Sequence, residues 1–192
     1  MTAFKELGAA DALTAIEERL GFPIVVKPAG QGSALGIKFA ATAREVPGAL
    51  VAAFSYGDKV LLERHVRGRD LAVSLLDGEV LPVVEAVPRE GDFYDFESRY
   101  EIGRTEFVCP AALPDAVTAR AQDLAFQVWD VLGCRAFARV DLMLCEATGE
   151  LTVLEANAIP GMTETSLLPM AADAAGIDFD ALIGRIVDLA HL

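Results

Sequence analysis

Two apolar segments in the second half of the chain carry paired polar side chains, and this pattern limits the fold more than any other feature. Arg139 and Asp141 alternate with aliphatic residues in segment 137–144, and the segment that follows ends with Glu155 and Asn157. Side chains two residues apart on a strand share a face. Charged groups are costly on core strands. The pattern predicts two neighbouring antiparallel strands that carry a polar site.

The residue types in this pattern favour a magnesium site. Two carboxylates and one carboxamide are oxygen ligands of the kind that Mg²⁺ uses, with substrate phosphates completing its shell. We therefore predict Asp141, Glu155 and Asn157 as metal ligands. Arg139 beside them could stabilise a phosphoryl group in transfer. The alternative is a solvated strand face with acids placed there by chance.

A glycine-rich turn follows an apolar strand that ends in a lysine. Lys27 ends the predicted strand 22–27, the turn spans 30–36, and a return strand is expected at 37–40. This is a hairpin, not the strand–loop–helix of a P-loop. Backbone N–H groups of the turn could cradle phosphates that Lys27 contacts. Many hairpins are merely tight, so this motif alone is weak.

In the rest of the chain, segments with apolar residues at helical spacing alternate with segments typical of β-hairpins. Helices are predicted at residues 10–20, 44–54, 116–132, 166–175 and 180–190, and further strands at 60–63, 70–76, 80–86, 137–144 and 151–155. Residues 88–110 are polar and irregular, and a loop of that length is usually functional. Strands outnumber what one βαβ alternation would give, so the predicted fold class is α+β.

Composition excludes several classes of function. A net charge of −13 disfavours nucleic-acid binding. No segment approaches the ~20 apolar residues of a membrane helix, and the N-terminus has no signal core, so we expect a cytoplasmic protein. The three cysteines form no CxxC, and only two histidines are present. A zinc site is therefore not expected.

One strand end offers a candidate nucleotide contact. Backbone groups around Glu63, His65 and Val66 could pair with an adenine edge, and Asp70, seven residues past Glu63, could bind ribose hydroxyls. On its own this segment also fits an ordinary strand end.

The order of these pieces resembles the ATP-grasp fold, and specifically the D-alanine–D-alanine ligase family. The similarity runs from about residue 22 to 189 through the segments VVKPAGQGSALGI, LLERHVRGRDLAV, DFYDFESRY, VCPAAL, LGCRAFARVDLML and VLEANAIPGMTETSLLPMAA. It implies antiparallel-rich sheets with packed helices. Residues 1–66 would form the central subdomain with the phosphate hairpin, and residues 67–192 the C-terminal subdomain with the metal and D-alanine sites.

The resemblance also implies roles for individual residues. Lys27 would touch the ATP phosphates, Glu63 and Val66 would bind adenine, His65 would lie by the purine where tryptophan is common, and Asp70 would hold the ribose where glutamate is usual. Two Mg²⁺ ions, with Mn²⁺ as a substitute, would sit on Asp141, Glu155 and Asn157. Arg139 and the backbone of Gly161 would stabilise the tetrahedral intermediate, and Ser166 and Leu167 would bind the second substrate.

A loop over the site completes the implied machinery. Tyr94 to Tyr100 would cover it, with Ser33 hydrogen-bonded near Tyr100, and Arg99 stands where the family has lysine. The charge is kept there, but guanidinium geometry differs from that of an ammonium. Tyr100 points to an amine as the second nucleophile.

The implied reaction is the ATP-dependent joining of two D-alanines through an acylphosphate, for peptidoglycan precursors. A ligase for another amino acid or a hydroxy acid, and a nucleotide-binding module without turnover, stay open as alternatives. Family members carry a further N-terminal domain, so we expect an excised part of a longer ligase, inactive alone, rather than a naturally short homologue. Expected partners are ATP, D-alanine and that missing domain, with a homodimer as an option and neither nucleic acid nor membrane.

Overall fold

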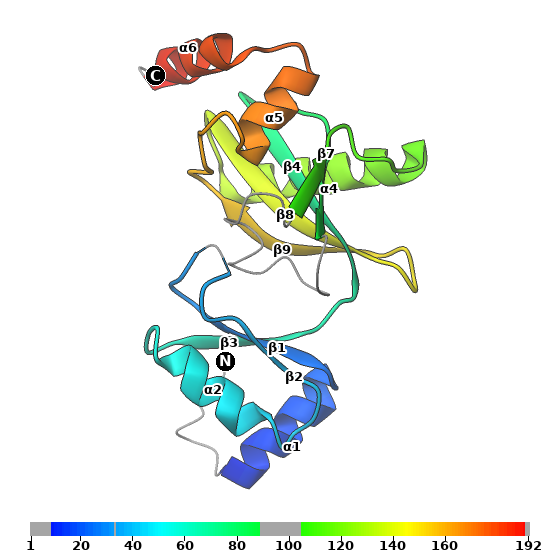
Figure 1. Ribbon diagram of the computed structural model, residues 1–192, viewed down its shortest axis with the longest axis vertical. Helices are drawn as coiled ribbons and strands as arrows, with labels where there is room; N and C mark the ends of the chain where they lie inside the picture. Colours follow the sequence, from blue (N-terminus) through cyan, green and yellow to red (C-terminus); the bar gives the residue numbers. More distant parts are fainter. Residues whose placement is uncertain (1–8, 33, 89–104, 191–192) are drawn as a thin grey trace. The chain divides into compact units, whose positions relative to one another are not determined.

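The computed structural model describes residues 9–32, 34–88 and 105–190 (Figure 1). Its chain divides into two compact units between His65 and Val66. The described residues up to His65 belong to unit 1, and those from Val66 onward belong to unit 2. Each unit has its own sheet and its own hydrophobic core.

Unit 1 is a three-stranded antiparallel sheet with helices on one face. Its strands, in the order β2-β1-β3, are β2 (Lys38–Ala40), β1 (Ile24–Pro28) and β3 (Val60–Arg64), and its helices are α1 (Ala9–Leu20) and α2 (Val46–Phe54). Ile24 and Val26 are fully buried and pack with side chains of both helices. The predicted helix, strand and hairpin pattern of this region is confirmed, although α2 begins at Val46.

The alternate residues of the same strands point to the opposite face of this sheet. Val25 is in register with Phe39 on one side and with Glu63 on the other, and Lys27 is in register with Leu61. Because side chains alternate along a strand, these residues lie on the face that α1 and α2 leave uncovered. All of them are partly or fully exposed to solvent within the unit.

Unit 2 is built on a six-stranded antiparallel sheet with helices on both faces (Figure 1). The strand order is β7-β6-β4-β8-β9, with β5 paired to β4. The strands are β4 (Gly68–Leu76), β5 (Glu79–Val80), β6 (Val84–Pro88), β7 (Thr105–Val108), β8 (Phe137–Cys145) and β9 (Leu151–Asn157). The helices are α4 (Asp115–Leu132), α5 (Leu167–Ala174) and α6 (Phe179–Leu189).

Each face of the unit 2 sheet has its own core. Alternate residues of β4 and β8, such as Val73 and Val140, pack against Ala121, Ala125 and Trp129 of α4. The residues between them face the other way, where Ala72 and Leu76 of β4 pack with α5 and α6. The α+β class predicted from the sequence is confirmed.

Two predictions about strands were wrong. The single strand expected at 80–86 is broken into β5 and β6 by Leu81-Pro82-Val83. Proline has no N–H for the ladder, so a strand rarely continues through it. The segment 88–110 was expected to be irregular, yet β7 lies within it and pairs with β6 along Glu85–Pro88. Residues 89–104 of that segment lie outside the described part of the chain.

A β-bulge interrupts the pairing of β8 with β9. Asp141 is in register with Glu155, but Leu142 is in register with Val153, so Leu154 has no partner in the ladder. Val153 therefore shares a face with Leu142, whereas two positions later Glu155 shares a face with Asp141. An inserted residue of this kind reverses the alternation of a strand. Glu155 and Asn157 thus lie on the face away from α4.

Close backbone packing fixes the other end of β8. A Cβ atom at Gly68, the first residue of β4, would overlap the carbonyl oxygen of Leu144. Only glycine fits there.

Among the residues that the structure describes, no helix combines the length and the apolar character that a bilayer-spanning segment needs.

Candidate functional site

Arg139 and Asp141 form a bidentate ion pair on the side of β8 that faces away from α4. Arg139 Nε lies 2.6 Å from Asp141 Oδ1, and Nη2 lies 2.8 Å from Oδ2. Both residues are 8% exposed. A carboxylate this deep needs a matched cation, and the guanidinium provides it. The prediction that the two side chains share a face is confirmed.

Asn157 joins this pair to the second acidic residue. Its Nδ2 donates to Asp141 Oδ2 over 3.1 Å and to Glu155 Oε1 over 3.3 Å. The ladder explains the convergence, because Arg139 pairs with Asn157 and Asp141 with Glu155 across β8 and β9. Asp141 is buried, Asn157 is partly exposed and Glu155 is exposed. The cluster therefore reaches from the sheet interior to solvent.

This geometry fits the predicted magnesium ligands. One nitrogen atom contacts oxygens from both carboxylates, so those oxygens already lie around a common point. Asn157 now presents its Nδ2, and a half-turn of the carboxamide would present its oxygen instead. Two carboxylates and one carboxamide oxygen are hard donors of the kind that binds Mg²⁺. Within the described ranges, no three Asp, Glu, His or Cys side chains gather into a group that could hold a metal ion.

Gly161, Ser166 and Leu167 lie at the start of α5. A Cβ at Gly161 would stand 2.9 Å from Ser166 Oγ, so the two residues are close neighbours. The Ser166 hydroxyl lies 2.8 Å from Thr163 Oγ1 and accepts from the Thr163 N–H over 3.1 Å. Leu167 is 9% exposed and packs into the core beneath α5. Ser166 is thus the more accessible of the two predicted substrate residues.

In unit 1, Lys27 and Glu63 form an ion pair on the helix-free face. Lys27 Nζ lies 2.7 Å from Glu63 Oε2, with side-chain exposures of 17% and 39%. The pairing follows from the sheet, since β1 and β3 are neighbours and both side chains point to the same face. A lysine held here could bind phosphate oxygens, and the partner carboxylate keeps it oriented.

The glycine-rich turn is shaped by a contact with Tyr56. Gly36 has a φ of +78°, and a Cβ there would stand 2.6 Å from the Tyr56 ring. Gln31 Nε2 donates to the Tyr56 carbonyl over 2.9 Å. Within the turn, the Leu35 N–H donates to Gly32 O over 3.2 Å. At least this one of the N–H groups expected to cradle phosphates is already engaged inside the turn.

The predicted adenine and ribose residues are divided between the units. Glu63 and His65 belong to unit 1, whereas Val66 and Asp70 belong to unit 2. Asp70 occupies β4 in register with Met143 of β8, on the same face as Asp141. The remaining predicted residues, Ser33, Arg99 and Tyr100, lie outside the described residues, as does the rest of the expected loop 94–100.

A second ion pair, which is partly buried, was not predicted from the sequence. Arg69 Nε donates to Glu85 Oε1 over 2.6 Å, and Arg69 Nη2 donates to the Ala112 carbonyl over 3.0 Å. The hydrogen bond that the Arg69 guanidinium donates to Glu85 raises the pKa of Arg69. Glu85 is 7% exposed within the apolar run LPVVEAVP, and that context was the available signal. The pair ties β4 to β6 on the face opposite Asp70.

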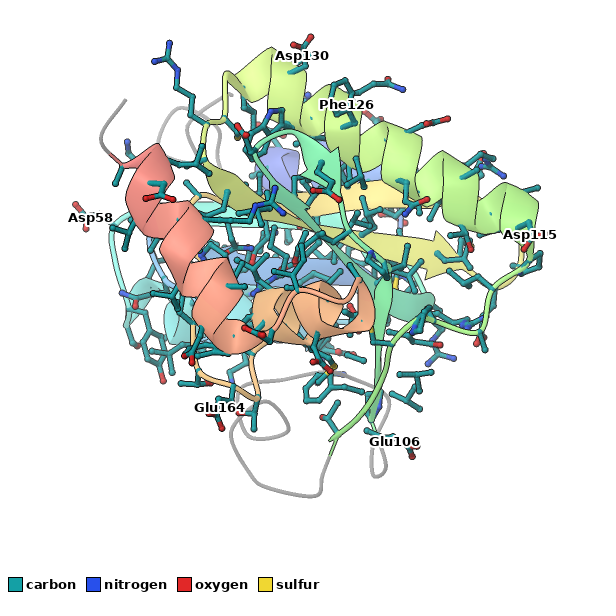
Figure 2. All side chains as sticks on the ribbon, turned by 90° about the horizontal axis from the view of Figure 1, so that it is seen from above. Asp58, Glu106, Asp115, Phe126, Asp130 and Glu164 are labelled. Carbon is teal, nitrogen blue, oxygen red and sulfur yellow. The ribbon has the colours of Figure 1, made fainter. Side chains whose placement is uncertain are left out.

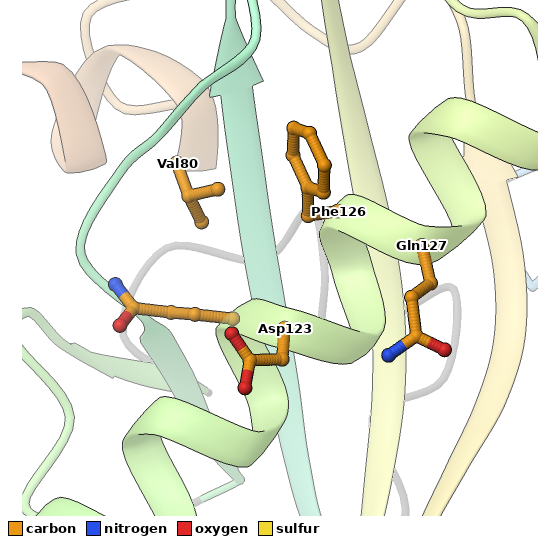
Figure 3. Close-up of a pocket in the computed structure, with 5 residues that line it drawn as sticks. Val80, Asp123, Phe126 and Gln127 are labelled. Atoms are coloured by element: carbon orange, nitrogen blue, oxygen red, sulfur yellow. The ribbon is translucent and has the colours of Figure 1, made fainter.

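Other surface features lie away from these residues. A pocket beside α4 is lined by Val80, Gln122, Asp123, Phe126 and Gln127, and none of these is a predicted site residue (Figure 3). The acidic side chains labelled in Figure 2 point away from the ribbon, as expected for solvated surface charge. They are Asp58, Glu106, Asp115, Asp130 and Glu164.

Comparison with known proteins assigns the chain to a family. The model of the family described as D-ala D-ala ligase C-terminus matches residues 3–188. A D-alanine–D-alanine ligase of Syntrophotalea carbinolica is 46% identical over 171 residues, which is 89% of this chain and 55% of that protein. One from Geobacter sulfurreducens is 39% identical over 178 residues, covering 92% and 56%. The chain spans about half the length of these relatives.

Solved structures agree with that assignment. The D-alanine–D-alanine ligase of Bacillus anthracis, complexed with ATP, matches with a TM-score of 0.78 and 30% identity, over 98% of this chain and 57% of that one. The VanG D-Ala:D-Ser ligase of Enterococcus faecalis matches with a TM-score of 0.81 and 27% identity, over 98% and 55%. The ATP-grasp fold predicted from the sequence is confirmed, and the chain belongs to the D-alanine–D-alanine ligase family as its C-terminal part.

Proposed function

We propose that this chain is the ATP- and metal-binding part of a ligase that joins two D-alanines to D-alanyl-D-alanine. The observation that carries the proposal is the convergence of Asp141, Glu155 and Asn157 beside Arg139. A related ligase solved with ATP supports nucleotide binding. The proposed dipeptide product, in which an amine has formed an amide bond, follows the names of the relatives at 39–46% identity.

The two units take the roles of the two ATP-grasp subdomains in this proposal. Unit 1, with the glycine-rich turn and Lys27, is the central subdomain, and unit 2 is the C-terminal subdomain with the metal and D-alanine residues. The N-terminal domain that the relatives possess would be a further partner, along with ATP and D-alanine. By family resemblance, two copies of the ligase would form a homodimer.

Asp141, Glu155 and Asn157 would hold two Mg²⁺ ions, which when bound supply charge neutralisation at the ATP phosphates. Arg139 would then turn from Asp141 toward the transferred phosphoryl group and stabilise its charge. Lys27 would hold the phosphates from unit 1. The carboxylate of one D-alanine would attack the γ-phosphate to give an acylphosphate and ADP. The amine of the second D-alanine would then attack the acyl carbon and release phosphate.

Residues at the start of α5 would place the second substrate. The Gly161 backbone N–H is expected to face the developing oxyanion, and Ser166 to bind the second carboxylate. Ser33, Arg99 and Tyr100 would close the site from the glycine-rich turn and the covering loop. The similarity to a D-Ala:D-Ser ligase supports D-serine as an alternative second substrate. Product analysis with D-alanine, D-serine and D-lactate distinguishes these substrates.

The metal assignment is tested by Glu155→Gln. Glu155 is exposed, so the substitution should leave the fold intact while removing one anionic metal ligand. We expect the affinity of the chain for Mn²⁺–ATP, measured by titration calorimetry, to fall at least tenfold. In the full-length ligase, turnover should fall with it. Glu146→Gln, on an exposed acid beyond the end of β8, is the matched control. Unchanged binding by Glu155→Gln would remove the metal site from the proposal.

A further inference from the structure

Ser74 is a buried polar residue to which the proposed function gives no role. It lies in β4 between Ala72 and Leu76, and alternation along the strand places it on the face that α5 and α6 cover. The residue is fully buried, and its hydroxyl has no hydrogen-bond partner among the residues that the structure describes. A buried hydroxyl without a partner costs free energy, and native structures hold few of them.

The register of the sheet places Ser74 directly beside Arg139. The two residues are partners across β4 and β8, and two positions away Ala72 and Asp141 are partners in the same way. Residues that oppose each other on antiparallel strands share a face, with Cβ atoms about 4.5–5.5 Å apart. The Ser74 hydroxyl therefore lies within reach of the Arg139 side chain, in the buried layer of the sheet.

The single proton on Arg139 Nε is donated to Asp141, with 2.6 Å between Nε and Oδ1. In the proposed function, Asp141 binds a metal ion and Arg139 turns toward the transferred phosphoryl group. Phosphoryl oxygens at the two terminal nitrogens leave Nε facing the sheet. Arg139 is 8% exposed, so water cannot easily replace the lost carboxylate at Nε. A buried donor that loses its acceptor is unfavourable.

We propose that Ser74 is a positioning residue for Arg139, and that its hydroxyl accepts the Nε–H when Asp141 binds metal. This inference rests on the proposed function and deepens it by adding a support for the arginine. A serine oxygen has two lone pairs, and its hydrogen rotates to suit the donor. Held at Nε, the guanidinium keeps both terminal nitrogens for the phosphoryl oxygens. The same movement gives the Ser74 hydroxyl the partner that it lacks while Arg139 is paired with Asp141.

The test asks whether loss of the Ser74 hydroxyl weakens metal–nucleotide binding without weakening the fold. The affinity of the 192-residue chain for Mn²⁺–ATP is measured by titration calorimetry for wild type, Ser74→Ala and Ser55→Ala. Urea denaturation without metal or ATP, followed by Trp129 fluorescence, gives the stability of unit 2 in each. Ser55 is exposed at the end of α2, where its hydroxyl donates to the Val51 carbonyl over 3.1 Å, and provides the matched loss of a hydroxyl.

A second background identifies the partner of Ser74. Arg139→Lys keeps a positive charge beside Asp141 but has no N–H at the position of Nε. The Ser74→Ala substitution is therefore also made in the Arg139→Lys chain, and its effect on Mn²⁺–ATP affinity is compared with its effect in the wild-type chain.

We expect Ser74→Ala to weaken Mn²⁺–ATP binding about tenfold, within the range for a buried donor left without an acceptor. Its urea midpoint should be no lower than that of wild type, because the change removes a buried hydroxyl that has no partner among the described residues. Ser55→Ala should bind as wild type does. In the Arg139→Lys chain, Ser74→Ala should leave the affinity unchanged.

Equal affinity in Ser74→Ala and wild type would overturn the inference while leaving the proposed function intact. The same loss in the Arg139→Lys chain would also overturn it, since Ser74 would then act without Nε. A loss of affinity that comes with a lower urea midpoint would make Ser74 a structural residue only. A wild-type chain that does not bind Mn²⁺–ATP would refute the proposed function and this inference together.

Discussion

Arg139 is the residue on which the buried charge of the site depends. It neutralises Asp141 through two hydrogen bonds, and both residues are 8% exposed. Asp141→Ala would leave a guanidinium buried without its carboxylate. Breaking a buried pair from one side typically costs about 3–5 kcal/mol.

We expect Asp141→Ala to lower the free energy of unfolding by about 3 kcal/mol. Glu155→Ala, on the exposed acid of the same cluster, should change it by less than about 0.5 kcal/mol. Urea denaturation followed by the fluorescence of Trp129 measures both. Similar losses for the two variants would show that the ion pair does not stabilise unit 2.

The thiols of Cys145 and Cys109 have pKa values that are shifted in opposite directions. A hydrogen bond from the Thr148 side chain, supported by backbone N–H groups of Thr148 and Ala147, lowers the pKa of Cys145. Burial raises the pKa of Cys109. A lowered pKa means more thiolate at neutral pH, and the thiolate is the nucleophile.

Cys145 should therefore react with iodoacetamide faster than Cys109 at pH 7, as measured by peptide mass spectrometry. Its rate should fall as the pH drops, because the thiolate is protonated. Thr148→Val should slow Cys145 and leave Cys109 unchanged. Faster labelling of Cys109 would contradict the assignment of these two environments.

Among the strands, the start of β4 allows the least change. A methyl group at Gly68 would overlap the Leu144 carbonyl, which is backbone and cannot move aside alone. Gly68→Ala should therefore disturb the pairing of β4 with β8 and destabilise the chain by about 3 kcal/mol, the upper part of the range for overpacking.

Gly48→Ala is the matched control for this prediction. Gly48 lies in α2 with nothing within 4 Å of an added Cβ. Alanine is the better helix former, so this variant should be more stable than wild type by up to about 1 kcal/mol. Thermal denaturation of both variants checks the contrast. Two variants of equal stability would show that the close approach at Gly68 is relieved at no cost.

Element patterns show where the sequence was informative. Helices and most strands follow from apolar spacing, because a helix or strand that covers a core must repeat at 3.6 or 2.0 residues. The Arg139–Asp141 face follows from the same rule. The apolar run around Pro82 favours one continuous strand, but the missing N–H of the proline breaks it into β5 and β6.

Other features could not be predicted from spacing. The bulge at Leu154 depends on the partner strand, so the sequence of β9 does not reveal which face Glu155 takes. The Lys27–Glu63 and Arg69–Glu85 pairs join strands far apart in sequence. Their partners are fixed by sheet order, and only the structure supplies that order.

For the whole molecule, the two units differ in the amount of core they contain. Unit 2 has two clusters of buried apolar residues, whereas unit 1 has one, built around Ile24, Val26 and Leu50. Smaller cores give less stability. The one tryptophan of the chain, Trp129, lies in unit 2.

We therefore expect urea to unfold unit 1 first. Circular dichroism should show an early change that Trp129 fluorescence does not follow, because the two probes report different parts of the chain. Ile24→Ala should move only the early change to lower urea. Coincident transitions by both probes would mean that the units unfold together.

The unpaired Leu154 decides where the β8–β9 hairpin can change in length. Val153 is in register with Leu142 and Glu155 with Asp141, so a strand that lacked only Leu154 would pair regularly and would keep Glu155 and Asn157 opposite Asp141 and Arg139. Lengthening the tip at residues 146–150 leaves that pairing untouched. Insertions at the tip and removal of the bulge residue are therefore both compatible with the acidic cluster, because neither changes which residues of β8 and β9 lie opposite each other at the site.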